Sequence, residues 1–156
     1  MLWSLPSIRS TFPQRNECHF HRYGELLRIT PAAIIPSMLG ETLLDHFQHP
    51  RNAGELPGAN AKVEVSNPVC GDVLHLAAII DNGAFREVRF LCRGCTAAIA
   101  CASLLTESIQ GRELSAVSSF TPEFLAAALG GLPPASYHAA QLSHDALQAL
   151  VRAARK

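Results

Sequence analysis

The chain has 156 residues, of which 48% are hydrophobic and 17% charged, with thirteen basic and thirteen acidic side chains. This length and apolar content suit one folded domain with a substantial core. The balanced charge gives no strong field to attract nucleic acid or anionic lipid, so we expect neither partner. Every apolar run is interrupted before the roughly 18 residues of a membrane-spanning helix, and we expect a soluble, cytoplasmic protein.

Residues 1–37 differ in composition from the rest of the chain. Four prolines interrupt any periodic pattern there: Pro6, Pro13, Pro31 and Pro36. We interpret this stretch as a disordered N-terminal extension or a spurious upstream start, and residues 38–156 as the folded domain. Mitochondrial targeting by residues 1–37 stays open as an alternative, although Glu17 and Glu25 are unusual in a transit peptide.

The first half of the domain predicts a short helix followed by a sheet. Leu43, Leu44 and Phe47 are spaced for one helical face, and Pro50 ends that helix. Alternating or β-rich runs then predict three strands, near residues 63–65, 73–80 and 85–92. Asn82-Gly83 accepts the positive φ angles of a tight turn and joins the last two strands as a hairpin. We expect a three-stranded antiparallel meander.

Helical periodicity takes over after Cys95. One predicted helix carries an apolar stripe and ends near Gly111. A second begins at Thr121 and ends at Gly130-Gly131, and a third runs from the Pro133-Pro134 region to the C-terminus. The inward residues expected for the first and third helices are Ala98, Ala102, Leu105, Ile109, Ala139, Leu142, Ala146 and Leu150. The fold class is therefore α+β, with the meander packed against several helices.

The cysteines are the first candidates for chemistry. Five occur, an odd number, with three crowded between positions 92 and 101. This pattern suits metal or redox chemistry in a reducing compartment better than a disulfide framework.

Cys70 and Cys95 are the strongest ligand candidates. Cys70 shares a predicted turn with Asp72, so a thiol and a carboxylate are presented together. Cys95 follows Gly94 and opens a helix, whose unpaired amides should favour the thiolate. The intervening hairpin can bring both thiols to one edge of the sheet, where soft ligands select zinc, copper(I) or iron-sulfur clusters.

The other cysteines and the histidines are weaker candidates for metal ligands. Cys92 forms a C-x-x-C with Cys95, but a zinc ribbon needs a second pair. Cys101 should face away from the site and pack in the core, and nothing is assigned to Cys18. His138 lies near the start of the last helix, where its imidazole could reach a metal. We interpret His46 and His49 as surface residues.

Four motifs in this order resemble the U-type iron-sulfur cluster scaffold family, which includes IscU, SufU and the N-terminal domain of NifU. They are Leu44-Asp45-His46-Phe47 with Pro50-Arg51-Asn52-Ala53-Gly54, Asn67-Pro68-Val69-Cys70-Gly71-Asp72, Phe90 through Gly94-Cys95-Thr96-Ala97-Ala98 to Ser103, and Leu132-Pro133-Pro134 before His138. The resemblance implies a SufE/NifU-like fold and a labile 2Fe-2S cluster, iron or zinc. It also implies that Cys70, Asp72, Cys95 and His138 are the ligands.

The chain departs from the family pattern at two positions. The family's third cysteine, which commonly receives sulfur from a cysteine desulfurase, would fall at Ala139. Ser136 replaces a lysine usual in IscU-type members, so the resemblance gives weak grounds for chaperone recognition.

We expect a scaffold or carrier rather than an enzyme, with a cysteine desulfurase and apo iron-sulfur acceptor proteins as partners. Two alternatives remain at this stage. One is a thioredoxin-like thiol oxidoreductase that uses Cys92 and Cys95. The other is a zinc-bound regulatory protein that docks on a desulfurase.

Overall fold

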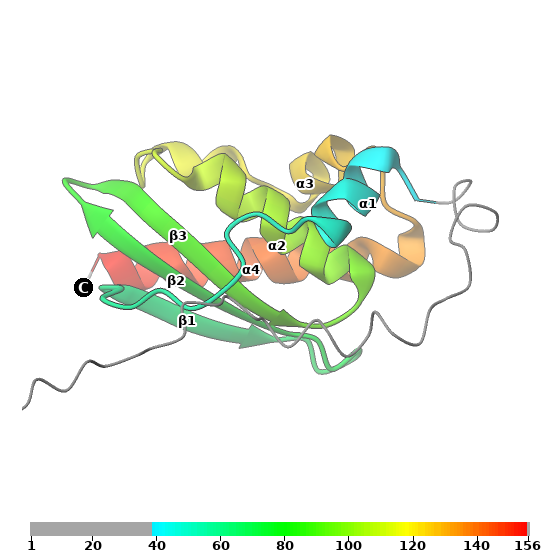
Figure 1. Ribbon diagram of the computed structural model, residues 1–156, viewed down its shortest axis with the longest axis horizontal. Helices are drawn as coiled ribbons and strands as arrows, with labels where there is room; N and C mark the ends of the chain where they lie inside the picture. Colours follow the sequence, from blue (N-terminus) through cyan, green and yellow to red (C-terminus); the bar gives the residue numbers. More distant parts are fainter. Residues whose placement is uncertain (1–38, 156) are drawn as a thin grey trace, which may run out of the picture. The chain divides into compact units, whose positions relative to one another are not determined.

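A computed structural model describes residues 39–155 and shows a three-stranded antiparallel sheet with helices packed against it (Figure 1). The strands are β1 (Ala61–Ser66), β2 (Val73–Asp81) and β3 (Ala84–Arg93), in the spatial order β1-β2-β3. The predicted α+β class and the meander are confirmed. The extension expected over residues 1–37 lies outside the described residues.

The hairpin between β2 and β3 has the predicted turn. Asn82 and Gly83 adopt φ angles of 50° and 77°, and Asp81 pairs with Ala84 across them. Because β3 runs antiparallel to β2, the C-x-x-C does not occur in the βαβ setting that the thioredoxin-like alternative requires. At the opposite end of the hairpin, Val73 pairs with both Ser66 and Arg93. The loop before β2 and the segment after β3 therefore meet at one end of the sheet.

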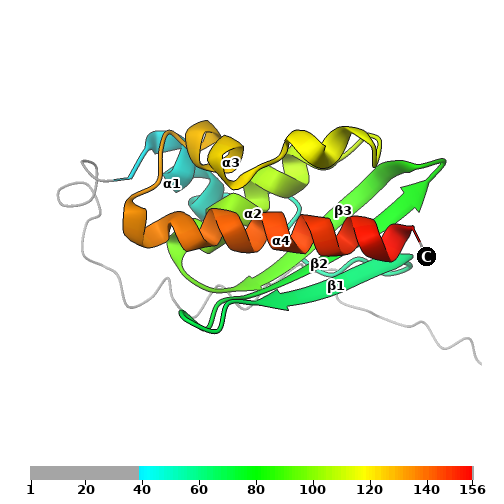
Figure 2. The ribbon, with the colours of Figure 1, turned by 180° about the vertical axis from the view of Figure 1, so that it is seen from behind.

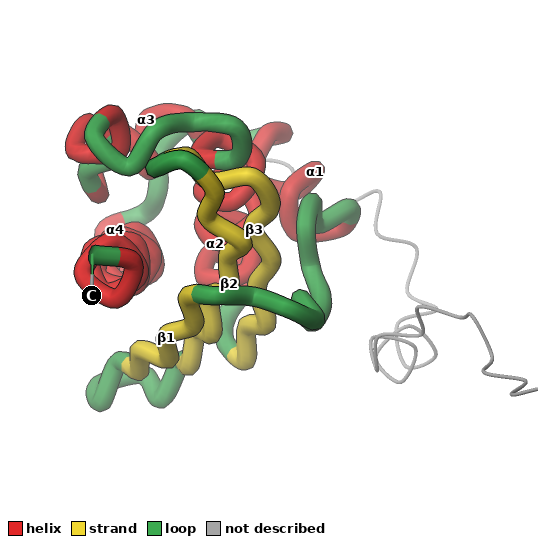
Figure 3. The backbone as a smooth tube through the Cα atoms, turned by 90° about the vertical axis from the view of Figure 1, so that its left-hand side faces the viewer, coloured by secondary structure: helices red, strands yellow, loops and turns green. Residues whose placement is uncertain are grey.

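Helices cover one face of this sheet (Figures 2 and 3). Helix α4 (Tyr137–Ala154) packs on β1 and β2, and α2 (Thr96–Ile109) packs on β3. Outside them, α1 (Glu41–Gln48) lies on α2, and α3 (Pro122–Ala128) lies on α4. Two short 3-10 turns, η2 (Ala116–Ser119) and η3 (Pro134–Ser136), precede α3 and α4. None of the helices within residues 39–155 combines the length and apolar content needed to cross a bilayer.

The core lies between the sheet and α2 and α4, as the periodicity predicts. All eight inward positions expected for these two helices are buried: Ala98, Ala102, Leu105, Ile109, Ala139, Leu142, Ala146 and Leu150. The sheet contributes Leu74, Leu76 and Val88 to the same cluster. Cys101 is fully buried there, which confirms its predicted core role.

His46 is not a surface residue, and that expectation was wrong. Only 4% of it is exposed, and its Nδ1 lies 2.9 Å from the Ser103 hydroxyl of α2. The same hydroxyl accepts a hydrogen bond from the Arg51 amide at 2.8 Å, so its own proton is free to be donated to His46. The neutral His46 then points Nε2 toward Glu107, 3.8 Å away. These contacts of His46 and Arg51 with Ser103 and Glu107 hold α1 and the following loop against α2.

Ser103→Ala should therefore lower the free energy of unfolding by about 1–3 kcal/mol, because it leaves a buried imidazole and a backbone amide without a partner. Urea denaturation of both proteins at neutral pH measures this difference. His49→Gln is the control, since His49 lies three residues after His46 but is exposed. An unchanged unfolding midpoint for Ser103→Ala would show that the network contributes no net stability.

The same network should make stability depend on pH. Burial is the main reason that the pKa of His46 is lowered, and the positive charge of Arg51 adds to the effect. The unfolded chain, with a usual histidine pKa near about 6.5, then binds the proton more readily than the folded protein. The contribution of neutral His46 to the free energy of unfolding is fully present above that pH and should decrease as the pH drops below it. Repeating the urea titration between pH 7.5 and 5.5, values chosen on either side of about 6.5, should show a smaller loss in His46→Gln than in the wild type.

Candidate metal site

The first part of the site is the loop between β1 and β2. Its backbone closes through the Asn67 amide, which donates to the Asp72 carbonyl at 2.8 Å, and the Gly71 amide, which donates to the Asn67 carbonyl at 2.8 Å. Gly71 adopts a φ of 75°, a left-handed conformation that suits glycine. This turn presents Cys70 to solvent while Asp72 turns inward.

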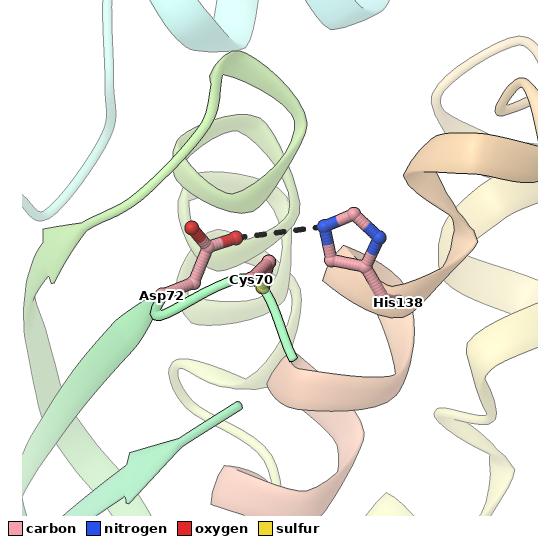
Figure 4. A group of neighbouring side chains, drawn as sticks. All are labelled: Cys70, Asp72 and His138. Carbon is pink, nitrogen blue, oxygen red and sulfur yellow. Dashed lines mark ion pairs between the residues drawn. The ribbon is translucent and has the colours of Figure 1, made fainter. Parts of the chain in front are cut away.

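Asp72 is a buried carboxylate whose surroundings leave one oxygen unsatisfied. The residue is 6% exposed, and Oδ2 has no hydrogen-bond partner among the described residues. The imidazole of His138 faces this oxygen, with its Nε2 3.6 Å from Oδ2 (Figure 4). A buried carboxylate oxygen without a donor is costly. A metal ion bound between Asp72 and His138 would remove that cost.

Gly94 makes room for this carboxylate. A Cβ on Gly94 would lie 2.9 Å from Asp72 Cγ and 3.1 Å from Asp72 Oδ1. Any larger residue at the bend between β3 and α2 would therefore collide with the acid. Sequence reasoning missed this role, because the only available signal was a glycine next to Cys95.

His138 reaches the site from the first turn of α4. The adjacent Tyr137 hydroxyl donates to Glu123 Oε1 at 2.6 Å, which links this turn to α3. One ligand atom from each of Cys70, Asp72 and His138 lies within 4.8 Å of the others. Figure 4 shows the three side chains facing one another from the β1–β2 loop and from α4. A thiolate, a carboxylate and an imidazole thus converge in a set that suits zinc or iron.

Cys95 lies beside this group without belonging to it. It is the N-cap of α2, and it is exposed. Its thiol is nevertheless partly buried, which is the main reason that its pKa is raised, and the charge of Asp72 raises the pKa further. The amides of Ala98 and Ala97 lower the pKa, as expected for a helix start, but they do not outweigh burial. The helix start therefore favours the Cys95 thiolate as expected, but burial and Asp72 outweigh this effect in the protein without metal.

Cys92 and Ala139 also border the site. Cys92 is half-buried, and burial followed by the charges of Asp72 and Cys95 raises the pKa of its thiol to about 12. Ala139, the position where the family would place its third cysteine, is fully buried on α4 next to His138. The structure thus offers two exposed thiols at this end of the sheet, on Cys70 and Cys95.

The family model of the NifU-like N terminal domain matches residues 39–156, a range that includes every residue of this site. The chain belongs to the NifU-like N-terminal domain family. The resemblance inferred from the motifs is confirmed.

Individual members of the NifU-like family agree with this assignment. The chain is 38% identical over 111 residues to an iron-sulfur cluster assembly scaffold protein, IscU 1, of Archaeoglobus fulgidus, covering 71% of this chain and 72% of the relative. It is 36% identical over 115 residues to the scaffold protein IscU of Haemophilus influenzae, covering 71% and 90% of the two chains. A crystal structure of a NifU-like N-terminal protein from Brucella abortus has the same fold, with a TM-score of 0.63 at 14% identity over 74% of this chain and 93% of the other.

Proposed function

We propose that this NifU-like protein is an iron-sulfur cluster assembly scaffold or carrier. It holds a labile 2Fe-2S cluster, iron or zinc through Cys70, Asp72, Cys95 and His138. The observation that carries the proposal is the convergence of the Cys70, Asp72 and His138 ligand atoms within 4.8 Å of one another. The relatives described as cluster scaffolds support the choice of cargo.

The exposure and the ligand types of this site suit a cluster that must be transferred to another protein. Cys70 and Cys95 are exposed, so a cluster held by them is open to an acceptor protein. Two thiolates with one imidazole and one carboxylate bind iron less tightly than a site with a third thiolate. The buried Ala139 supplies no such thiolate. We therefore assign the protein a binding role, with a cysteine desulfurase as the sulfur source and apo iron-sulfur proteins as acceptors.

Anaerobic reconstitution tests the scaffold function directly. The reduced protein is incubated with ferrous iron and sulfide salt, desalted, and examined by visible absorption and by iron and sulfide analysis. An apo acceptor is then added, and the absorbance should move to it. Wild type and Cys101→Ser should form equal amounts of cluster, since Cys101 is a fully buried core residue. Absence of any cluster in the wild type would reject this function.

Cys95→Ser tests the role of Cys95, the one proposed ligand that is not in the group of Cys70, Asp72 and His138. If Cys95 is a cluster ligand, the variant should form a shorter-lived cluster than the wild type in the same assay, because serine is a poorer ligand than a thiolate for iron. An equal cluster lifetime would remove Cys95 from the ligand set and leave the site on Cys70, Asp72 and His138. The same assay run with zinc, followed by metal analysis, separates a zinc-bound regulatory protein from a cluster carrier.

A further inference from the structure

The C-x-x-C segment occupies the bend between β3 and α2, beside the metal site. Cys92 lies at the end of β3 opposite Leu74, whose side chain is fully buried, so both residues face the helices. The chain bends at Gly94, and Cys95 then caps α2. Cys92 is half-buried and Cys95 is exposed. One thiol of the pair is therefore sheltered and the other is open to a partner.

The pair is also adjacent to the metal-binding acid. A Cβ on Gly94, inside the C-x-x-C segment, would lie 2.9 Å from Asp72 Cγ, so the Asp72 carboxylate lies beside this segment. Asp72 in turn faces His138, and its loop carries Cys70. Any small product released at Cys95 would thus emerge next to the residues that hold iron. Cys101, the remaining thiol of this region, is fully buried in α2.

We propose that Cys92 and Cys95 act as a dithiol that reduces sulfur delivered to Cys95, which releases that sulfur as sulfide at the metal site. This inference rests on the proposed scaffold function, because it assumes that sulfur arrives as a persulfide on the exposed Cys95. It assigns Cys92 the role of the resolving thiol.

The chemistry balances without a further reductant in the first turnover. The Cys92 sulfur attacks the inner sulfur of the Cys95 persulfide, which forms the Cys92–Cys95 disulfide and breaks the bond to the outer sulfur. The outer sulfur takes the electron pair and leaves as hydrosulfide, and the thiol proton of Cys92 goes to solvent. The two cysteine sulfurs are oxidised together by two electrons, and the outer sulfur is reduced by two. An external dithiol protein must then reduce the disulfide before the next turnover.

The test uses the full chain and a chemical sulfur donor. Reduced protein is loaded with inorganic polysulfide, desalted, and followed by sulfide release and by peptide mapping. The wild type should release about one sulfide per persulfide and accumulate the Cys92–Cys95 disulfide. Cys92→Ser should keep the persulfide on Cys95 and release at least about tenfold less sulfide until a dithiol is added. Cys101→Ser is the matched control and should behave as the wild type.

Equal sulfide release from wild type and Cys92→Ser, or a disulfide that joins Cys70 to Cys95 instead, would overturn the inference. Because Cys92 is half-buried, Cys92→Ala is tested in parallel, and circular dichroism checks that both variants fold. Reconstitution with iron and sulfide salt bypasses the persulfide. If the cluster reconstituted from these salts forms equally with and without Cys92, and Cys92 also makes no difference to sulfide release from the persulfide, this inference fails and the scaffold function stands. If no cluster forms in any variant, the scaffold function fails.

Discussion

Cys70→Ser should lower the affinity of the protein for zinc or ferrous iron at least about 100-fold, since changes in the outer shell of a site already cost 10- to 100-fold. Cys70 supplies the one thiolate among the three converging ligands, and a soft thiolate is the strongest donor that the site offers to these metals. Competition against a chromogenic chelator measures the affinity of each variant.

Two controls make that result specific. Cys101→Ser changes the same atom at a fully buried core position and should leave the metal affinity unchanged. The unfolding midpoint of Cys70→Ser without metal should equal that of the wild type, because Cys70 is exposed on its loop. If Cys70→Ser bound metal as tightly as the wild type, the group of Cys70, Asp72 and His138 would not be the metal site.

Gly94→Ala should have the second large effect, on stability and metal binding together. The new Cβ would lie 2.9 Å from Asp72 Cγ and 3.1 Å from Ala98 Cβ. Crowding of this kind costs about 1–3 kcal/mol. The carboxylate is the more movable neighbour, so it should shift away from His138 and weaken metal binding by about 10- to 100-fold. Urea denaturation and the chelator competition measure the two effects separately.

Gly111→Ala is the matched control for this variant. Gly111 has a φ of 80°, but a Cβ there would meet nothing within 4 Å. The substitution should cost about 1–2 kcal/mol through backbone strain alone and leave metal affinity unchanged. If Gly94→Ala lost stability to the same extent and kept its metal affinity, contact between Gly94 and Asp72 would have no role in binding.

The sequence by itself determined the elements and their order. Asn82-Gly83 specified the hairpin, because positive φ angles at both positions are a local property of these residues. Thr121 capped α3 as predicted, with its hydroxyl accepting from the Phe124 amide at 3.2 Å. The apolar stripes of α2 and α4 marked their buried faces, since periodicity depends on spacing along one helix. Four motifs in order were enough to identify the family.

The tertiary structure alone decided how the site residues are surrounded. His46 looked like a surface histidine until its partner Ser103, 57 residues further along the chain, was placed beside it. The raised pKa of Cys95 results from burial and from Asp72, which lies on another loop, and these two effects outweigh the lowering by the amides at the helix start. The space that Gly94 leaves for Asp72 is likewise a contact between segments remote in sequence. The burial of a site and the charge around it depend on every residue that is near in space. Sequence patterns give information mainly about residues that are near along the chain.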